Sequence, residues 1–327
     1  MSNKTKVIEN MNNWGKKSIP FLFIIDFEMK NPLAYRIDEI YNAEILYQLN
    51  ENTNNPSIGA LPGDFIFNKF PIPLPVYSRQ YDKVIRHIAM GNTYLLNLTC
   101  ATPIKIDLSL RDIYNFSESK YKLLFRDEFV CFSPETFINI SNGKVRSYPM
   151  KGTIDASIEN AEHIIMTDAK ETAEHYTIVD LIRNDLNMVA KNVSVERFRY
   201  IDTIKTSHKN LLQVSSVISG DLGSDFASHI GDIIFTLLPA GSISGAPKKK
   251  TVEIILDTEE YQRGYYTGIF GYFDGKNLDS AVMIRFIEKT VDGMIYKSGG
   301  GITSFSDKES EYYEMIDKVY VPINRKH

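Results

Sequence analysis

Two short acidic segments carry the residues best suited to binding a cation. The segment KETAEH contains Glu171 and Glu174, and the segment ESEYYE contains Glu311 and Glu314. Residues three apart lie on one face of a helix, so each segment presents two carboxylates together. A solvated acidic face is the ordinary fate of such pairs, but apolar neighbours indicate partial burial. If the two faces meet, ligands that are all oxygen favour Mg²⁺.

A di-iron centre is the alternative metal interpretation, because it also pairs helical glutamates. It requires a Glu-x-x-His motif on two helices of a four-helix bundle. Here His175 directly follows Glu174, and strand-like segments surround both acidic segments. Magnesium is therefore the preferred metal.

A lysine stands in a turn that otherwise looks built for close packing. The stretch SYPMKGT, Ser147 to Thr153, runs from a β-favouring pair through a proline into Gly-Thr, and Lys151 lies within it. One interpretation is a solvated loop lysine. The other is an amine directed into a pocket. These residues alone do not decide between the two.

Two glycine-rich segments and one arginine point to an anionic ligand. PAGSISGAPKKK, residues 239–250, lacks the spacing of a phosphate loop, yet N–H groups at a helix entrance suit other anions. SGGGIT places Gly299, Gly300 and Gly301 in a row, which permits close approach of a ligand, although a flexible hairpin is the simpler interpretation. Arg285 lies in the apolar strand SAVMIRFIE, where a guanidinium suits a carboxylate. Together these features predict a pocket for a small dicarboxylate.

Composition narrows the class of protein. The chain has 327 residues, 43% of them hydrophobic, and a formal net charge of −4, which argues against a general nucleic-acid binder. No uninterrupted apolar run approaches the roughly 20 residues that span a bilayer, and the N-terminus lacks the apolar core of a secretory signal. Cys100 and Cys131 form no metal-binding spacing and are expected to be buried. The expected location is the cytoplasm, with no membrane or nucleic-acid partner.

The elements that must position these residues alternate without a regular βαβ rhythm. Helices are predicted for 82–90, 168–189, 247–261 and 308–319. Strands are predicted for 21–27, 93–99, 128–132, 265–273, 280–289 and 294–297, and a hairpin for 136–140 with 144–148, closed at Asn142-Gly143. Strand meanders separated by single long helices indicate an α+β fold. Residues 48–63 are a plausible linker, and the prolines of 65–78 favour an extended edge segment.

Eight motifs occur together in the order of a known family. They are GNTYLLNLT, SPETF, PMKGT, KETAEHYTIVDLIRNDL, GSISGAPKKKTVEIILDTEEYQRGYYTGIFGYF, AVMIRF, SGGGIT and DKESEYYEMIDK. In these motifs the chain resembles the chorismate-utilising enzymes, and above all the aminodeoxychorismate synthase component I group. The resemblance implies a single domain, 1–327, with two large antiparallel sheets packed across each other and helices outside. Residues 1–76 would be a shortened N-terminal part and 77–323 the catalytic core.

The resemblance also implies roles for the site residues. Glu174 and Glu314 match Mg²⁺ ligands, and Glu171 and Glu311 match metal-site residues that support these ligands or reach the ion through water. The ion would bind the ring carboxylate of chorismate. The enolpyruvyl carboxylate would be held by Tyr266 and Arg285, with the backbone of Gly299, Gly300 and Gly301 and the side chain of Lys318 nearby in the substrate site. Positions beside the substrate match Ser242 and Thr153.

Lys151 matches the covalent nucleophile of aminodeoxychorismate synthases, where anthranilate synthases read P-I-A-G-T without a functional group. A buried amine beside a dication is expected to have a depressed pKa and hence a reactive neutral fraction. It would add to C2 of the ring as the 4-hydroxyl leaves, protonated by Glu135 of SPETF. Ammonia would then attack C4 and expel the lysine.

The sequence differs from the motifs of the family that it resembles in three places. Leu95 stands where members that add water carry a lysine base, which disfavours isochorismate and salicylate synthesis. The family motif H-L-V-S is replaced within LLQVSS, residues 211–216, and His208 lies upstream and out of register. The short N-terminal part predicts no feedback inhibition. In DLIRNDL, Asp180, Arg183 and Asp185 are expected to make structural polar contacts.

The chain carries no recognisable glutaminase signature, so a separate glutamine amidotransferase subunit is expected to supply ammonia to the chorismate-bound enzyme. Two alternatives stay open on sequence grounds. One is anthranilate synthase component I, which would go on to eliminate pyruvate. The other is an inactive homologue that binds an anion.

Overall fold

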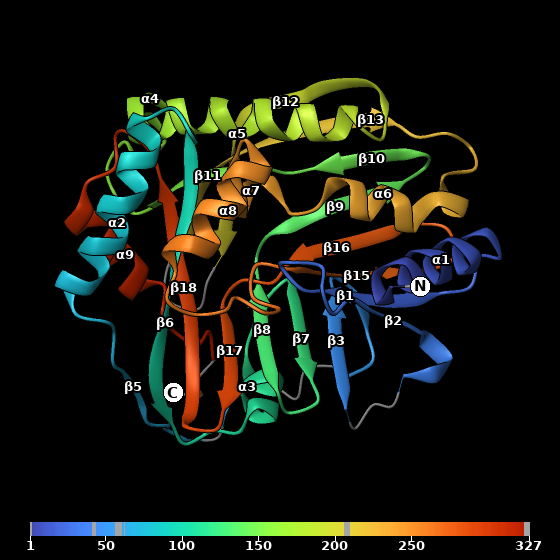
Figure 1. Cartoon of the computed structure of the whole chain (residues 1–327), viewed down its shortest axis with the longest axis horizontal. Coiled ribbons are helices and arrows are strands. Elements are labelled where there is room, and N and C mark those ends of the chain that lie inside the picture. The colour runs from blue at the N-terminus through green and yellow to red at the C-terminus, as the bar shows by residue number, and fades with distance from the viewer. Residues whose placement is uncertain (1, 41–43, 56–60, 62, 206–209, 324–327) are drawn as a thin grey trace.

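Two antiparallel sheets form the framework of the computed structural model, which describes residues 2–40, 44–55, 61, 63–205 and 210–323 (Figure 1). The first sheet has the order β11 (Met150–Asp155), β13 (Asn210–Asp221), β10 (Lys144–Ser147), β9 (Thr136–Ser141), β16 (Leu278–Val282), β15 (Ile269–Phe273), β1 (Phe21–Ile25) and β2 (Leu33–Arg36), with β12 (Lys191–Lys205) also paired to β13. The second has the order β14 (Gly245–Ala246), β6 (Leu95–Ile106), β18 (Gly293–Ile302), β17 (Phe286–Thr290), β8 (Phe129–Ser133), β7 (Tyr121–Phe125), β3 (Ile45–Leu49) and β4 (Asn52–Thr53), with β5 (Phe67–Lys69) paired to β6. This arrangement confirms the predicted α+β fold with two sheets.

Strand β1 shows why the sheets are packed on both faces. Its sequence FLFII is wholly buried. Successive side chains of a strand point to opposite faces. Phe21, Phe23 and Ile25 join a core shared with helices, whereas Leu22 and Ile24 join the core between the two sheets. An uninterrupted apolar run is therefore what this position requires.

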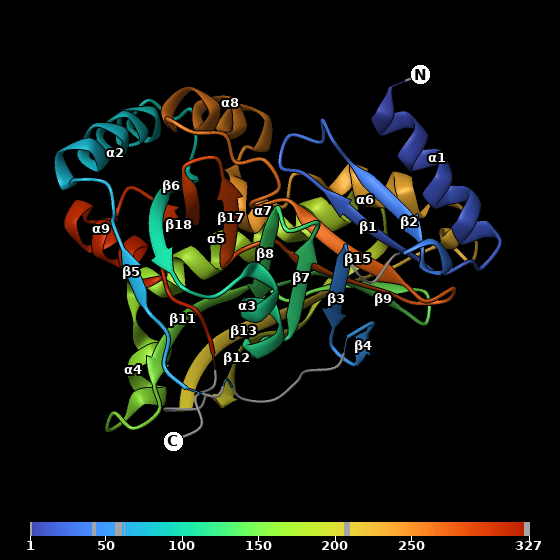
Figure 2. The ribbon, with the colours of Figure 1, turned by 90° about the horizontal axis from the view of Figure 1, so that it is seen from below.

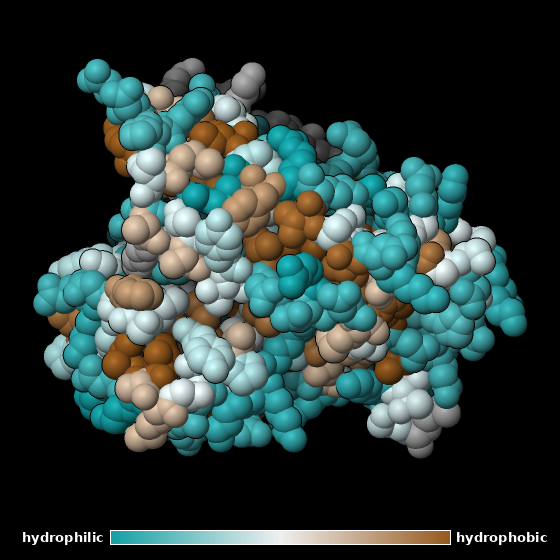
Figure 3. All heavy atoms as spheres, turned by 90° about the horizontal axis from the view of Figure 1, so that it is seen from above, coloured by the Kyte–Doolittle hydropathy of each residue, from teal (hydrophilic) through white to brown (hydrophobic). Residues whose placement is uncertain are grey.

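The helices cover the outer faces of the sheets (Figure 2). Against the first sheet lie α1 (Asn3–Lys16), α4 (Ala161–Thr167), α5 (Ala169–Asn187) and α6 (Ile230–Leu237). Around the second lie α2 (Leu74–Ala89), α3 (Leu110–Phe116), α8 (Lys248–Thr258) and α9 (Lys308–Asp317). The short helices are η1 (Ile37–Glu39), η2 (Phe226–His229) and α7 (Gly241–Ser244). Seen from above, hydrophilic residues cover most of the surface, and apolar ones form several separate groups (Figure 3).

Most predicted elements are confirmed. The hairpin forms as β9 and β10, with Asn142 and Gly143 at positive φ in its turn. The predicted helices 168–189, 247–261 and 308–319 correspond to α5, α8 and α9, and the strands 21–27, 93–99, 128–132 and 294–297 to β1, β6, β8 and β18. Strand β15 is shorter than predicted, because residues 265–268 form a turn before it. Both cysteines are buried and free.

Two predictions about the early segments are wrong in part. The proline-rich stretch 65–78 is extended only as far as Pro73, and Pro75 lies in the first turn of α2, where a missing N–H costs nothing. The helix predicted for 82–90 therefore begins eight residues earlier. The predicted linker 48–63 opens with residues of β3 and with β4, and its residues 56–60 and 62 lie outside those described.

One described stretch, Phe226–Ser244, is long and apolar enough to cross a membrane by length and composition. His229 and Asp232 interrupt its apolar sequence, and half of the stretch is buried inside the protein. It comprises η2, α6 and α7 rather than one continuous helix. It therefore carries little weight as a membrane segment.

Candidate active site

The site forms where two neighbouring strands cross together from one sheet to the other. Strand β8 of the second sheet continues into β9 of the first, and β16 of the first continues into β17 of the second. The predicted single strand 280–289 is thus wrong, because it divides at residues 283–285. The crossings are tied together by backbone hydrogen bonds from Val282 N to Glu135 O (3.1 Å) and from Phe132 N to Arg285 O (3.2 Å). Arg285 has φ +53°, the left-handed region, which breaks strand alternation at this point.

A cavity of about 530 Å³ opens at these crossings. Its size lies within the roughly 300–1,000 Å³ of small-molecule sites. Every residue predicted to touch substrate or metal lines it: Glu135, Lys151, Thr153, Glu171, Glu174, Ser242, Tyr266, Arg285, Gly299, Gly300, Gly301, Glu311, Glu314 and Lys318. The structure therefore brings together side chains that are distant in sequence.

Strand β11 directs Lys151 into the cavity. Its pairing with β13 shifts register between Lys151 and Thr153, at Gly152, which has φ +76°. The bulge lets Lys151 reach Glu174 of α5, with 3.0 Å between Nζ and Oε2. The lysine side chain is 23% exposed and the glutamate 8%. Of the two interpretations of Lys151, an amine directed into a pocket is the one that the geometry supports.

The carboxylates around Lys151 shift its pKa in the direction opposite to the depression that is expected beside a dication. Burial alone lowers the pKa of the amine, but the carboxylates of Glu174, Glu171 and Glu314 act in the opposite direction and outweigh it. The net result is a raised pKa. The sequence argument considered burial and a dication, and left out the bare carboxylates that stabilise the ammonium form.

The carboxylates of α9 approach a strand without side chains. A Cβ atom at Gly300 would lie 3.0 Å from Glu311 Oε2 and 3.7 Å from Glu314 Oε1. Glu314 pairs with Lys318 at 2.6 Å, and Lys318 Nζ also donates to Gly299 O at 2.9 Å. Glu311 accepts a hydrogen bond from Ser306 Oγ at 2.7 Å. The glycine run therefore admits the helix carboxylates to the cavity.

The four glutamates suit a hard cation in kind, since all their donors are oxygen and all face one cavity. As they lie, no group of three His, Cys, Asp or Glu side chains within the described residues is arranged to hold a metal. Instead, two of the carboxylates form ion pairs with lysines, Lys151–Glu174 and Lys318–Glu314. A cation would have to replace those ammonium groups and draw the side chains inward.

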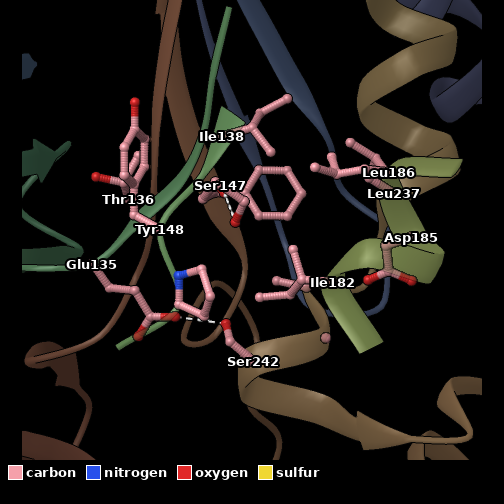
Figure 4. A pocket seen from close by; sticks show the side chains of 14 residues that line it. Glu135, Thr136, Ile138, Ser147, Tyr148, Ile182, Asp185, Leu186, Leu237 and Ser242 are labelled. Atoms are coloured by element: carbon pink, nitrogen blue, oxygen red, sulfur yellow. Dashed lines mark hydrogen bonds between the residues drawn. The ribbon is translucent and has the colours of Figure 1, made fainter. Parts of the chain in front are cut away.

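Glu135 is half-buried and has a hydroxyl partner (Figure 4). Ser242 Oγ donates to Glu135 Oε1 at 2.6 Å. Burial raises the pKa of the Glu135 carboxyl, although this hydrogen bond and the cations Lys151, Arg285 and Lys318 act against it. A raised pKa keeps a proton available on the carboxyl, which is what a general acid requires.

Arg285 and Tyr266 also line the cavity. Arg285 Nε is buried without a hydrogen-bond partner within the described part of the chain. Its guanidinium lies 5.4 Å from the centre of the Tyr320 ring. Tyr266 is 3% exposed, and burial raises its pKa. A buried N–H without an acceptor is suited to a ligand carboxylate.

Sequence reasoning missed three polar residues that line the cavity. Asn97 donates from Nδ2 to Ile243 O at 3.1 Å. Gln213, in the stretch LLQVSS, is paired in register with Thr153. Lys297 is 2% exposed and donates to backbone carbonyls of Gln262 and Arg263. A lysine inside an apolar strand was the available signal for Lys297. His208 lies outside the described residues.

The fold and the site together define a chorismate-utilising enzyme, and the comparisons agree. The family model described as chorismate binding enzyme matches residues 59–324, so the chain belongs to this family. Solved structures with the same fold include a putative 2,3-dihydroxybenzoate-specific isochorismate synthase from Bacillus anthracis (TM-score 0.71, 17% identity, 95% of this chain and 87% of that one). Anthranilate synthase component I from Streptococcus pneumoniae TIGR4 has TM-score 0.65 and 24% identity, covering 79% of this chain and 59% of that one.

The sequence relatives include an uncharacterized protein of similar length and two longer proteins named as synthases. An uncharacterized PabA-like protein of Haemophilus influenzae is 49% identical over 97% of this chain and 96% of its own length. Aminodeoxychorismate synthase component 1 of Bacillus subtilis is 30% identical, over 75% of this chain and 54% of its own length. Anthranilate synthase component 1 of the same organism is also 30% identical, over 89% of this chain and 57% of its own length. Overall identity therefore does not separate the two activities.

Proposed function

We propose that the chain is an aminodeoxychorismate synthase component I, which uses ammonia to convert chorismate to 4-amino-4-deoxychorismate for p-aminobenzoate and folate synthesis. The observation that carries the proposal is the position of Lys151, an amine inside the cavity and close to the carboxylates of two helices. Anthranilate synthesis has no use for a nucleophile at this position, whereas amination through a lysine adduct requires one.

The chain's own groups suit each proton transfer. The neutral Lys151 amine forms a bond to C2 of the ring, the ring double bonds shift, and the C4–O bond breaks. Glu135 gives its proton to the leaving hydroxyl, which departs as water. Ammonia then bonds to C4 and gives one proton back to Glu135, the double bonds shift back, and the C2–N bond breaks to return the neutral lysine amine. The sum is chorismate plus ammonia giving aminodeoxychorismate plus water.

Mg²⁺ is part of the proposal, with Glu174 and Glu314 as ligands and Glu171 and Glu311 beside them. Bound there, it would neutralise the carboxylates that raise the Lys151 pKa and would hold the ring carboxylate. Arg285 and Tyr266, which line the same cavity, would bind the second carboxylate. A separate glutaminase subunit would supply ammonia in the cell, and the cytoplasm is the expected location.

Product identification tests the proposal. The protein is incubated with chorismate, MgCl₂ and ammonium, and the products are separated and identified by mass spectrometry. A product that becomes p-aminobenzoate only after a lyase is added supports the proposal. Anthranilate would contradict it and favour the second candidate. The variant Lys151→Ala should abolish turnover, and a wild-type adduct on Lys151 should be detectable by mass spectrometry of the intact protein.

A further inference from the structure

Tyr320 contacts Arg285 from outside the substrate cavity. The centre of its ring lies 5.4 Å from the guanidinium carbon of Arg285. Arg285 lines the cavity, whereas Tyr320 is not among the described residues that line it. Tyr320 is also 45% exposed, so it does not belong to the core. It can therefore act on a ligand in the cavity only through the arginine.

A short extended segment, residues 319–323, holds Tyr320 in place. The segment follows α9 directly, and residues at both of its ends are buried, with Val319 1% exposed and Ile323 8% exposed. Ile323 also forms a β-bridge with Ser117, at the end of α3. The backbone on both sides of Tyr320 is thus fixed by contacts that do not involve its ring.

Arg285 gains from such a contact because it keeps a donor for a ligand. Its Nε is buried without an acceptor within the described part of the chain. A long side chain that is free to rotate loses rotamer entropy when a ligand immobilises it, and this loss weakens binding. An aromatic ring within about 6 Å attracts a guanidinium through the negative face of the ring. The contact with Tyr320 therefore orders the arginine before a ligand arrives.

Pairs of an arginine and an aromatic ring also occur elsewhere in this protein, where they stabilise the fold or the surface. The described arginines that lie over an aromatic ring are Arg126, Arg197, Arg263 and Arg285. Of these four, Arg285 is the one that lines the substrate cavity. The same kind of contact therefore has a different consequence at this position.

We propose that Tyr320 is a positioning residue for chorismate binding, because its ring holds the Arg285 guanidinium in the orientation that receives the second carboxylate of the substrate. The inference rests on the proposed function, in which Arg285 binds that carboxylate. The segment that carries Tyr320 continues from α9, the helix of Glu311 and Glu314. One stretch of chain thus contributes to the binding of both substrate carboxylates.

Equilibrium binding of chorismate tests the proposal without turnover. Isothermal titration calorimetry with MgCl₂ and without ammonium gives Kd for each variant. We expect Tyr320→Leu, which removes the ring, to raise Kd about fivefold, equal to about 1 kcal/mol. Tyr320→Phe keeps the ring and should remain within about twofold of the wild type.

Tyr313→Leu is the matched control. Tyr313 is 57% exposed on α9, and its ring contacts Tyr312. It is not among the described residues that line the substrate cavity. Its Kd for chorismate should equal that of the wild type within about twofold. Thermal unfolding checks that all the variants are folded.

A double-mutant cycle separates positioning from a general effect on the fold. In the Arg285→Met background the ring has no guanidinium to hold. Tyr320→Leu should then change Kd by less than about twofold, although it changes Kd about fivefold when Arg285 is present. If the fivefold effect persists in the Arg285→Met background, Tyr320 acts independently of the arginine and the inference is wrong.

The remaining outcomes distinguish this inference from the proposed function. If the wild-type protein forms anthranilate, the proposed amination fails, while a raised Kd in Tyr320→Leu still supports the role of Tyr320. If folded Tyr320→Leu binds chorismate as tightly as the wild type does, the inference is wrong whatever the product is. It is equally wrong if Tyr320→Phe binds as weakly as Tyr320→Leu. A wild-type protein that binds no chorismate would overturn both.

Discussion

Two buried arginines near the site differ in how fully their donors are used. Arg263 donates to both oxygens of Glu259, at 2.8 and 2.6 Å, to Asn97 O at 2.6 Å, and to Thr267 and Ile243. Arg285 leaves its buried Nε without an acceptor within the described residues and faces the substrate cavity. The first arginine is saturated by the fold, and the second keeps a donor for a ligand.

The two arginines act in sequence. Arg263 binds the backbone carbonyls of Asn97 and Ile243, and both of these residues line the substrate cavity. The hydrogen bonds of Arg263 therefore hold in place a part of the cavity that Arg285 also lines. A buried polar group satisfied on all sides stabilises one conformation, whereas an unsatisfied one at a cavity indicates a ligand. This difference predicts opposite results when each arginine is removed.

The largest effect is expected for Arg263→Ala. The variant leaves the Glu259 carboxylate buried, with Thr99 N and Oγ1 as its remaining donors. Breaking a buried ion pair in this way costs about 3–5 kcal/mol of unfolding free energy. Urea unfolding followed by circular dichroism measures it. Arg183→Ala is the control, since its pair with Asp180 is exposed and its removal should cost less than about 1 kcal/mol. Equal losses in the two variants would contradict the distinction.

Neighbouring glycines of β18 should show the same division between fold and site. A Cβ atom at Gly299 would lie 2.2 Å from Leu98 O, a backbone atom that cannot move aside. Gly299→Ala should therefore cost about 1–3 kcal/mol of stability. At Gly300 the obstacle is the Glu311 carboxylate, at 3.0 Å, which can rotate. Gly300→Ala should lose less than about 1 kcal/mol of stability, but weaken magnesium-dependent activity about tenfold or more.

Unfolding curves and magnesium titrations of the two variants give both readouts. If Gly300→Ala showed normal magnesium dependence, the carboxylates of α9 would not be ligands of the ion. A Gly299→Ala protein as stable as the wild type would show that β6 and β18 can separate without loss.

The same division explains what could be predicted from the sequence. Lys151, Glu135 and the four helical glutamates were identified because their motifs are short and contiguous, and the structure places them around one cavity. The hairpin at Asn142-Gly143 was predictable because its turn is encoded by two adjacent residues. Features that a few adjacent residues encode can therefore be predicted without knowledge of the tertiary structure.

What could not be predicted depends on contacts between distant segments. The break between β16 and β17 follows from a change of sheet, and the apolar run 280–289 gives no sign of it. The sign of the Lys151 pKa shift depends on Glu171 and Glu174 of α5 and on Glu314 of α9, all of which lie twenty or more positions away in the sequence. Arg263 lies within one of the eight motifs, but the motif does not reveal that its guanidinium binds Glu259 and two backbone carbonyls of distant segments.

Arg285→Met should affect binding more than folding. The variant removes the donor proposed for the second substrate carboxylate, and we expect KM for chorismate to rise about 30-fold, or about 2 kcal/mol. Stability should be unchanged or slightly higher, because a buried N–H without an acceptor has been removed. Arg285→Lys keeps the positive charge without the planar guanidinium group. Its KM for chorismate should lie between those of the wild type and Arg285→Met. A loss of stability like that of Arg263→Ala would show that Arg285 is structural.

The smallest effect is expected at Glu135, a half-buried acid that lines the same cavity. Burial raises its folded pKa above the unfolded value, so between these two values the folded protein keeps a proton that the unfolded chain has lost. The free energy of unfolding therefore falls as pH rises through this window. Glu135→Gln cannot ionise and escapes that loss. Its stability relative to wild type should therefore increase from pH 4 to pH 8.

Urea unfolding of both proteins across that pH range measures the difference, and the exposed Glu162→Gln is the matched control. The control should show a difference that hardly changes with pH, since an exposed carboxyl is hydrated in both states. If Glu135→Gln behaves like the control, the acid ionises as freely as a surface glutamate. It would then hold no proton at neutral pH to give to a leaving hydroxyl, and the proposed role of Glu135 would fail while the ligand-binding role of Arg285 would stand.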